Sequence, residues 1–128
     1  MPRDILIVED TETAATTLEI ALTSLPDVNV IRVGDGLRAL EYLAAENDRR
    51  IGAVVTDLDM PLLDGFELIR RLRQQERFAR LPIVVVSANS DPQTSQRVLH
   101  LGADAYFPKP WSALEVQRKV RDLLQRQE

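Results

Sequence analysis

Five side chains with the chemistry for phosphoryl transfer stand out in the sequence, each at or just beyond the end of a short apolar segment. They are Glu9, Asp10, Asp57, Ser87 and Lys109. Three converging carboxylates repel one another, so such a group is tolerated mainly when a cation lies in it. A small number of oxygen ligands with room for water suits Mg²⁺ better than Zn²⁺ or Ca²⁺. A metal ion, a positioned carboxylate, a hydroxyl and an ammonium are the parts that phosphoryl transfer needs.

Asp57 is the candidate nucleophile, because a carboxylate can accept a phosphoryl group as an acyl phosphate. The alternative is a turn aspartate or a helix N-cap, which is a common role after a strand. Met60-Pro61 and Asp64-Gly65 predict a longer loop before the next helix, and this favours the nucleophile.

The other four residues also have simpler interpretations. Glu9 and Asp10 could be solvated acids that cap the first helix, and Ser87 could simply end a strand. Lys109 is different, because it is one of only two lysines beside fourteen arginines. A compact ammonium fits a phosphoryl oxygen without the fork that a guanidinium presents.

The elements that must position these side chains alternate along the chain. Five apolar segments have strand length and are mostly β-branched or aromatic: 5–8, 28–33, 53–56, 83–86 and 105–107. Stretches with helical spacing of apolar residues separate or follow them: 14–25, 37–43, 66–72, 92–101 and 113–124. Asp91-Pro92 predicts a helix start, Gly102 a helix end, and Ser112 with Glu115 a capping box.

Alternating strands and helices predict an α/β fold with a doubly wound parallel sheet, five strands and five helices. The second strand contains Asn29 and Arg32, and the fifth is short and runs into Pro108, so both are predicted to be edge strands. The order consistent with this is 2-1-3-4-5, as in flavodoxin-like folds. Ligands of such sheets bind at the carboxyl ends of the strands, beside the point where the order reverses.

The sequence resembles the receiver domain of two-component response regulators, of the single-domain, chemotaxis-regulator-like kind, over essentially its whole length. The matching pieces are Glu9-Asp10, Asp57 through Gly65, Ser87-Ala88, Gly102 through Tyr106, and Lys109-Pro110. Each motif alone is weak, but together, in this order and at these strand ends, they are highly specific. The resemblance implies a single receiver domain over 1–128 with no output domain.

The resemblance also assigns roles to the site residues. It implies that Asp57 is the phosphoacceptor and that Lys109 pairs with the phosphoryl oxygens. Asp10, Asp57 and the backbone carbonyl of Asp59 would hold Mg²⁺, with Glu9 acting through water. The protein would thus be a switch that helps to catalyse its own phosphorylation and dephosphorylation, and not a metabolic enzyme.

The switch that the resemblance implies couples Ser87 to Tyr106. Ser87 would move toward the phosphoryl group as Tyr106 rotates, and this would remodel the surface of the fourth helix, fifth strand and fifth helix. The Lys109-Pro110 peptide is expected to be cis. The implied partners are a sensor histidine kinase or phosphotransfer protein and an unidentified downstream protein, and phosphorylation-linked dimerisation is left open.

A haloacid-dehalogenase-type phosphatase is the alternative from another class, because Asp57-Leu58-Asp59 also fits its Asp-x-Asp motif. That family expects Thr or Val four residues after the first aspartate, where this chain has Pro61. It also has its additional metal acids late in a larger chain. A receiver-like module without phosphorylation is disfavoured by the chemically competent site residues. A P-loop or dinucleotide site would need a glycine-rich turn after the first strand.

The composition of the chain limits which other classes of protein it can belong to. The chain of 128 residues has a net charge of -4, no cysteine and no apolar run of membrane-spanning length, so a disulfide scaffold is excluded and a membrane anchor is not expected. The net acidity argues against nucleic-acid binding, and a cytoplasmic location is the default expectation. The arginines of 70–77 are predicted to be the solvated face of a helix.

Four further residues lie near these motifs. The side chains of Asp59 and Asn89 are either solvated or line the mouth of the site, where they would tune attack of water on the acyl phosphate. Trp111 is expected to pack at the start of the last helix. His100 is expected on the surface of the fourth helix.

Overall fold

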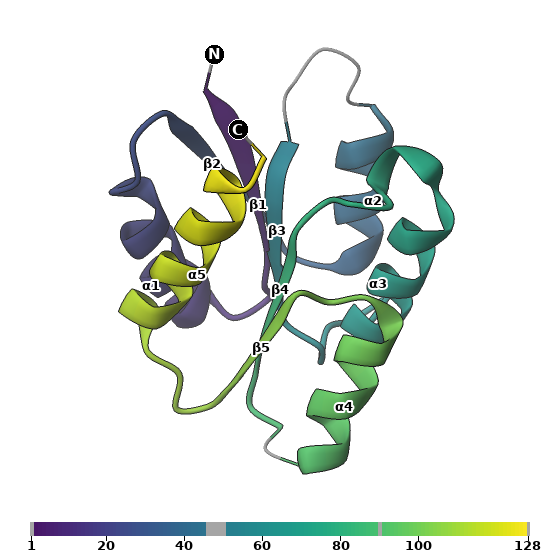
Figure 1. Cartoon of the computed structure of the whole chain (residues 1–128). Helices are drawn as coiled ribbons and strands as arrows, with labels where there is room; N and C mark the ends of the chain where they lie inside the picture. Colours follow the sequence, from purple (N-terminus) through teal and green to yellow (C-terminus); the bar gives the residue numbers. More distant parts are fainter. Residues whose placement is uncertain (1, 46–50, 90, 128) are drawn as a thin grey trace.

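A parallel sheet of five strands forms the centre of the computed structural model, which describes residues 2–45, 51–89 and 91–127 (Figure 1). The strand order is β2-β1-β3-β4-β5, so the predicted order and both edge strands are confirmed. The strands are β1 (Arg3–Val8), β2 (Val28–Val33), β3 (Ile51–Thr56), β4 (Ile83–Ser87) and β5 (Ala105–Pro108). Strands β1 and β3 begin two residues before their apolar segments because backbone pairing extends beyond them.

The helices cover both faces of the sheet. They are α1 (Glu12–Thr23), α2 (Gly36–Ala44), α3 (Gly65–Gln74), α4 (Pro92–Leu101) and α5 (Ala113–Gln125). Helices α1 and α5 lie on one face, and α2, α3 and α4 lie on the other (Figure 1). A short 3₁₀ helix, η1 (Glu76–Phe78), lies between α3 and β4, and its sequence carries no periodic signal that predicts it.

Helix ends follow the predicted capping residues. Asp91 accepts a hydrogen bond from the Gln93 backbone N–H at 2.9 Å and precedes Pro92 at the start of α4. Gly102 ends α4 with φ of 117°, a left-handed conformation that glycine adopts at little cost. Ser112 accepts from the Glu115 N–H at 3.2 Å, which confirms the cap of α5.

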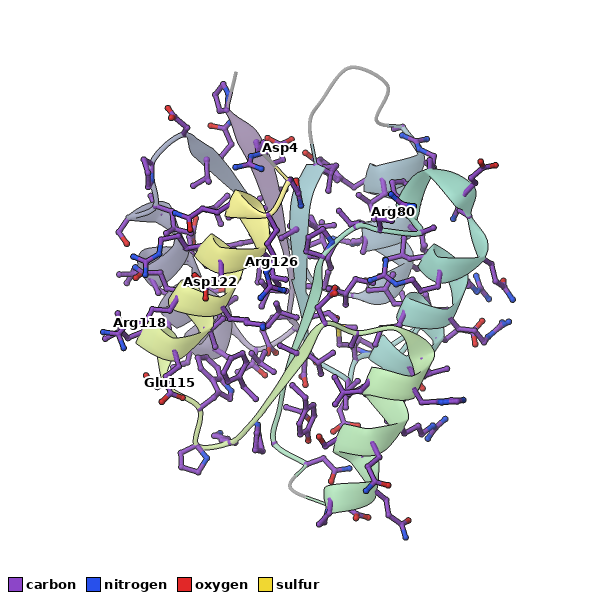
Figure 2. The ribbon with its side chains drawn as sticks, viewed as in Figure 1. Asp4, Arg80, Glu115, Arg118, Asp122 and Arg126 are labelled. Atoms are coloured by element: carbon purple, nitrogen blue, oxygen red, sulfur yellow. The ribbon has the colours of Figure 1, made fainter. Side chains whose placement is uncertain are left out.

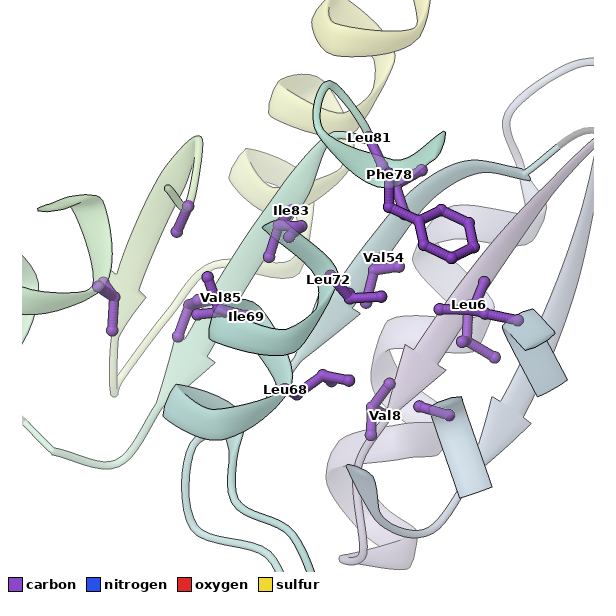
Figure 3. Packing of buried hydrophobic residues seen from close by; sticks show 14 of the residues in the cluster. Leu6, Val8, Val54, Leu68, Ile69, Leu72, Phe78, Leu81, Ile83 and Val85 are labelled. Atoms are coloured by element: carbon purple, nitrogen blue, oxygen red, sulfur yellow. The ribbon is translucent and has the colours of Figure 1, made fainter. Parts of the chain in front are cut away.

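Two hydrophobic clusters hold the layers together, one on each side of the sheet. In β1, Ile5 and Ile7 face α1 and α5, and the alternate residues Leu6 and Val8 face the other cluster. Side chains of α3, including Leu68, pack onto β1, β3 and β4 (Figure 3). Because the central strands are buried on both faces, their carboxyl ends have little freedom to move.

The helices are amphipathic, as their spacing predicts. Helix α5 buries a stripe of four apolar residues, whereas Glu115, Arg118, Asp122 and Arg126 are exposed along it (Figure 2). None of the helices in the described ranges is long and apolar enough to span a bilayer.

One prediction about α3 is wrong. Arg70 and Arg71 are exposed and pair with Glu67, but Arg73 does not belong to the solvated face. Its side chain is only 16% exposed, and its guanidinium donates to the backbone carbonyls of Phe78 and Gly102. These partners are distant in sequence or in another element, so helical spacing does not reveal them.

Leu68 offers a test of the core on the α3 side. Its side chain is completely buried, and Leu68→Ala should lower the free energy of unfolding by about 2 to 5 kcal/mol, since it removes apolar contacts and leaves a cavity. Urea unfolding followed by circular dichroism measures this change. Ile20 is 70% exposed on α1, and Ile20→Ala should change the same quantity by less than about 0.5 kcal/mol. Equal losses for the two variants would contradict the assigned packing.

Candidate functional site

Three carboxylates meet at the carboxyl ends of β1 and β3. Oxygen atoms of Glu9, Asp10 and Asp57 all lie within 4.8 Å of one another. Backbone hydrogen bonds fix this arrangement, because the Asp57 N–H donates to Val8 O at 3.0 Å and the Glu9 N–H donates to Val33 O at 3.1 Å. The predicted convergence of these acids therefore follows from the pairing of β1 with both its neighbours.

Glu9 has the most perturbed environment of the three acids. Glu9 as a whole residue is only 8% exposed to solvent. Burial raises the pKa of Glu9 from 4.5 to about 7, the Thr11 N–H opposes this rise by donating to the carboxylate, and the charges of Asp57 and Asp10 add to it. A carboxylate that is destabilised by burial and by like charges is one that a cation would stabilise.

Asp57 is held by its own loop. Its carboxylate accepts a hydrogen bond from the Leu58 N–H at 2.7 Å. Burial raises the pKa of Asp57, while N–H groups of Leu58 and Asp59 oppose the rise. The N-cap of α3 is Asp64, whose side chain accepts from the Glu67 N–H. Asp57 is therefore not the capping residue of α3.

Gly65 allows α3 to begin directly against the backbone of Asp57. The Gly65 N–H donates to Leu58 O at 2.9 Å, and a Cβ at this position would collide with the Asp57 carbonyl oxygen and with Leu58. Any larger residue would push α3 away from the site. In the sequence this glycine is only one residue of a motif, and the close approach gives it a physical role as a positioning residue.

Ser87 and Lys109 lie on the β4 and β5 side of the same site. Both line a pocket of about 340 Å³ that Glu9 and Asp57 also line. The Lys109 N–H donates to Ser87 O at 2.6 Å, and the Lys109-Pro110 peptide is cis, as expected. Among the described residues, the Lys109 ammonium has no ion-pair partner, so it can neutralise an incoming anion.

Tyr106 connects the site to the surface near α4. Its hydroxyl donates to the Asn89 backbone carbonyl, and the Asn89 N–H donates to the Ser87 hydroxyl oxygen at 3.0 Å. Partial burial raises the pKa of Tyr106, and hydrogen bonding with the Ser87 side chain opposes the rise. A displacement of Ser87 would therefore change the contacts of Tyr106.

Several pocket residues were not predicted. Thr13 and Thr17, four residues apart, turn one face of α1 toward the pocket, and Thr11 and Trp111 contribute to its wall. Trp111 also packs against the α1 and α5 cluster, as predicted. For Thr13 and Thr17, the only signal in the sequence is their spacing of four residues, which places both on one face of a helix. Asp59 and Asn89 are exposed and are not among the lining residues of this pocket.

Comparison with known proteins agrees with this geometry. The family model of the response regulator receiver domain matches residues 5–121. The chain belongs to the response regulator receiver domain family. It is thus a receiver domain of two-component signal transduction, a phosphorylation-dependent switch. The family model therefore favours the receiver interpretation over the phosphatase alternative.

Similar proteins include regulators and receiver domains of kinases. The alkaline phosphatase synthesis transcriptional regulatory protein PhoP of Bacillus subtilis is 35% identical over 128 residues, which are 100% of this chain and 51% of that protein. This receiver domain therefore spans about half the length of that curated relative.

Two solved structures match nearly the whole receiver domain. The signal receiver domain of a signal transduction histidine kinase from Syntrophus aciditrophicus is 31% identical with a TM-score of 0.84, and covers 96% of this chain and 90% of that one. The receiver domain of a sensor histidine kinase from Pseudomonas aeruginosa is 31% identical with a TM-score of 0.83. This match covers 98% of this chain and 99% of that one. The latter structure has a magnesium ion coordinated in its active site cleft.

The raised pKa of Glu9 predicts a pH dependence for the metal-free receiver domain. Between pH 4.5 and about 7 the unfolded chain releases a proton from Glu9 that the folded state retains. The contribution of Glu9 to stability is therefore largest below pH 4.5 and is lost as the pH rises through about 7. This loss should be on the order of 2 kcal/mol.

Urea unfolding in the presence of a chelator, at several pH values across this window, measures the effect as a difference between the parent chain and Glu9→Gln. The variant should show a less negative slope of unfolding free energy against pH, because it has no proton to release. Identical slopes would contradict the assigned environment of Glu9.

Proposed function

We propose that Asp57 accepts a phosphoryl group from a phosphohistidine on a sensor histidine kinase or a phosphotransfer protein. The observation that carries this proposal is the convergence of Glu9, Asp10 and Asp57 within 4.8 Å, beside a pocket that Glu9 and Asp57 line together with Ser87 and Lys109. The chemistry of these side chains matches the needs of phosphoryl transfer better than any other reaction class.

The transfer exchanges one bond to phosphorus for another. A carboxylate oxygen of Asp57 forms a P–O bond, while the P–N bond of the phosphohistidine breaks and the imidazole leaves with the electron pair. The Lys109 ammonium neutralises a phosphoryl oxygen, and the Ser87 hydroxyl donates a hydrogen bond to another. Hydrolysis of the acyl phosphate returns Asp57 to its free state, so the domain contributes to both reactions without being a turnover enzyme.

The residues present fit a bound Mg²⁺. Three hard carboxylate oxygens lie close enough to share one cation, and a cation would relieve the burial and like-charge repulsion that raise the pKa of Glu9. Asp10, Asp57 and the Asp59 backbone carbonyl would hold the ion, with Glu9 acting through water. Mg²⁺ would supply neutralisation of the developing charge on the phosphoryl oxygens. The magnesium ion in the related Pseudomonas aeruginosa receiver domain supports this choice.

The output of the switch is proposed to be a changed surface over α4, β5 and α5. The hydrogen bonds of Asn89 with Ser87 and Tyr106 support this, because they connect the site to the start of α4. A downstream protein would dock on that surface, and a phosphorylation-linked dimer would use the same elements. We place this activity in the cytoplasm, where histidine kinases present their phosphorylated domains, with no direct nucleic-acid contact.

Intact-mass measurement after exposure to a small acyl-phosphate donor tests the proposal. With Mg²⁺ present, the parent chain should gain the mass of one phosphoryl group, because Asp57 is the nucleophile and the cation lowers the repulsion. The adduct should be absent without Mg²⁺ and absent in Asp57→Asn. An adduct on Asp57→Asn would place the acceptor elsewhere, and rapid turnover of phosphomonoesters would favour a phosphatase.

The Asp59 side chain offers a separate test of how the phosphorylated state decays. We expect Asp59→Asn to change the rate at which the phosphoryl group is lost, since the carboxylate two residues from Asp57 would repel or orient the attacking water. Loss of the adduct mass with time after removal of the donor measures this rate. Equal rates in the variant and the parent would show that the Asp59 side chain is merely solvated.

A further inference from the structure

Helix α4 is weakly embedded in the protein. Only Thr94 and Val98 are buried among its residues, whereas α3 buries four residues. With so few buried apolar contacts, the orientation of α4 depends strongly on the polar contacts at its two ends. The contacts at the N-terminal end connect α4 to Ser87, whereas those at the C-terminal end connect it to α3.

The N-terminal end of α4 is tied to the candidate phosphorylation site. The Asn89 side chain accepts from the Asp91 N–H at 2.9 Å, and the Asn89 N–H donates to the Ser87 hydroxyl oxygen. Asp91 then caps α4. Farther along the helix, the guanidinium of Arg97 lies 3.9 Å from the centre of the Phe66 ring on α3. The start of α4 therefore follows the segment after Ser87.

The C-terminal end of α4 is tied to the rigid part of the fold by Arg73 of α3. Its guanidinium donates two hydrogen bonds to the Gly102 carbonyl, at 3.0 Å and 2.8 Å. It also donates to Phe78 O at 2.7 Å and pairs with Asp104 at 3.3 Å. Asp104 accepts from the N–H of Ile83 at the start of β4. One side chain thus joins α3, η1, β4 and the end of α4.

The environment of Arg73 makes these contacts strong. Its side chain is 16% exposed, and hydrogen bonds from a charged donor gain strength where water is excluded. Burial lowers the pKa of Arg73, and the charge of Asp104 opposes that change. Gly102 lets the guanidinium stem approach closely, because a Cβ there would contact Arg73 at 2.9 Å. Gly102, in its left-handed conformation, and the largely buried Arg73 therefore make one close contact at the C-terminal end of α4.

We propose that Arg73 is the positioning residue that fixes the C-terminal end of α4, so that α4 pivots about Gly102 when the segment after Ser87 rearranges. The trigger of the movement rests on the proposed function, whereas the fixed end rests on the contacts of Arg73 alone. Phosphorylation would therefore change the position of the first turns of α4 and leave its last turn in place.

Pairs of spin labels test the pivot, and the absence of cysteine from the chain makes labelling unambiguous. Ile20→Cys on α1 serves as the reference. It is combined either with Gln93→Cys in the first turn of α4 or with His100→Cys in its last turn, and all three positions are exposed. Pulsed electron paramagnetic resonance then gives the distribution of distances for each pair.

In the unphosphorylated protein, the distribution should be broader for the pair with Gln93→Cys than for the pair with His100→Cys. Arg73→Met should broaden the His100→Cys distribution until it matches the other. Arg71→Met is the matched control, because Arg71 is an exposed residue of the same helix that pairs with Glu67, and it should change neither distribution. If Arg73→Met does not fold by circular dichroism, Arg73→Lys, which keeps the charge but cannot reach both carbonyls, should give intermediate broadening.

A His100→Cys distribution that is as broad as the other in the parent chain, or that stays narrow when Arg73 is replaced, would overturn the proposal. After treatment with acyl phosphate and Mg²⁺, the mean distance should shift for the Gln93→Cys pair and not for the His100→Cys pair. Equal shifts would also overturn it. Intact mass of the same sample reports whether Asp57 carries the adduct, so failure of the proposed function is seen separately from failure of the pivot.

Discussion

The mutual repulsion of three carboxylates at the end of β1 and β3 is the constraint on which the site depends. Folding brings Glu9, Asp10 and Asp57 within 4.8 Å and buries Glu9 enough to raise its pKa to about 7. Like charges in a partly dry site are unfavourable, so the fold must hold them there against their repulsion. A bound cation would relieve this repulsion, and it would also offset the negative charge that an incoming phosphoryl group brings.

The rigidity of the sheet is what holds the acids together. Strands β1, β3 and β4 are buried on both faces, and backbone hydrogen bonds connect the ends of neighbouring strands at Glu9, Asp57 and Lys109. Gly65 lets α3 close against the backbone of Asp57. By contrast, α4 buries only Thr94 and Val98, and the proposed pivot would place its movement at the end nearest Ser87.

Strand order and capping could be predicted because their signals are local. Asn29 and Arg32 identified an edge strand, and Gly102 and Ser112 marked helix ends through their own conformational preferences. The convergence of Asp57 with Glu9 followed from the sheet order. Arg73 could not be predicted in the same way, because its partners are carbonyl groups that any residue carries. The side of the pocket formed by Thr13 and Thr17 likewise depends on how α1 packs, which spacing alone does not specify.

The acid cluster is proposed to be a cation site for chemistry at Asp57. Trp111 is the only tryptophan and lines the same pocket, so its fluorescence can report binding. Titration of the metal-free chain with Mg²⁺ should give a saturable change that fits one site, and Asp10→Asn should abolish or greatly weaken it. The absence of a saturable response in the parent chain, with stability also unchanged by Mg²⁺, would contradict the account, as would unaltered affinity in Asp10→Asn.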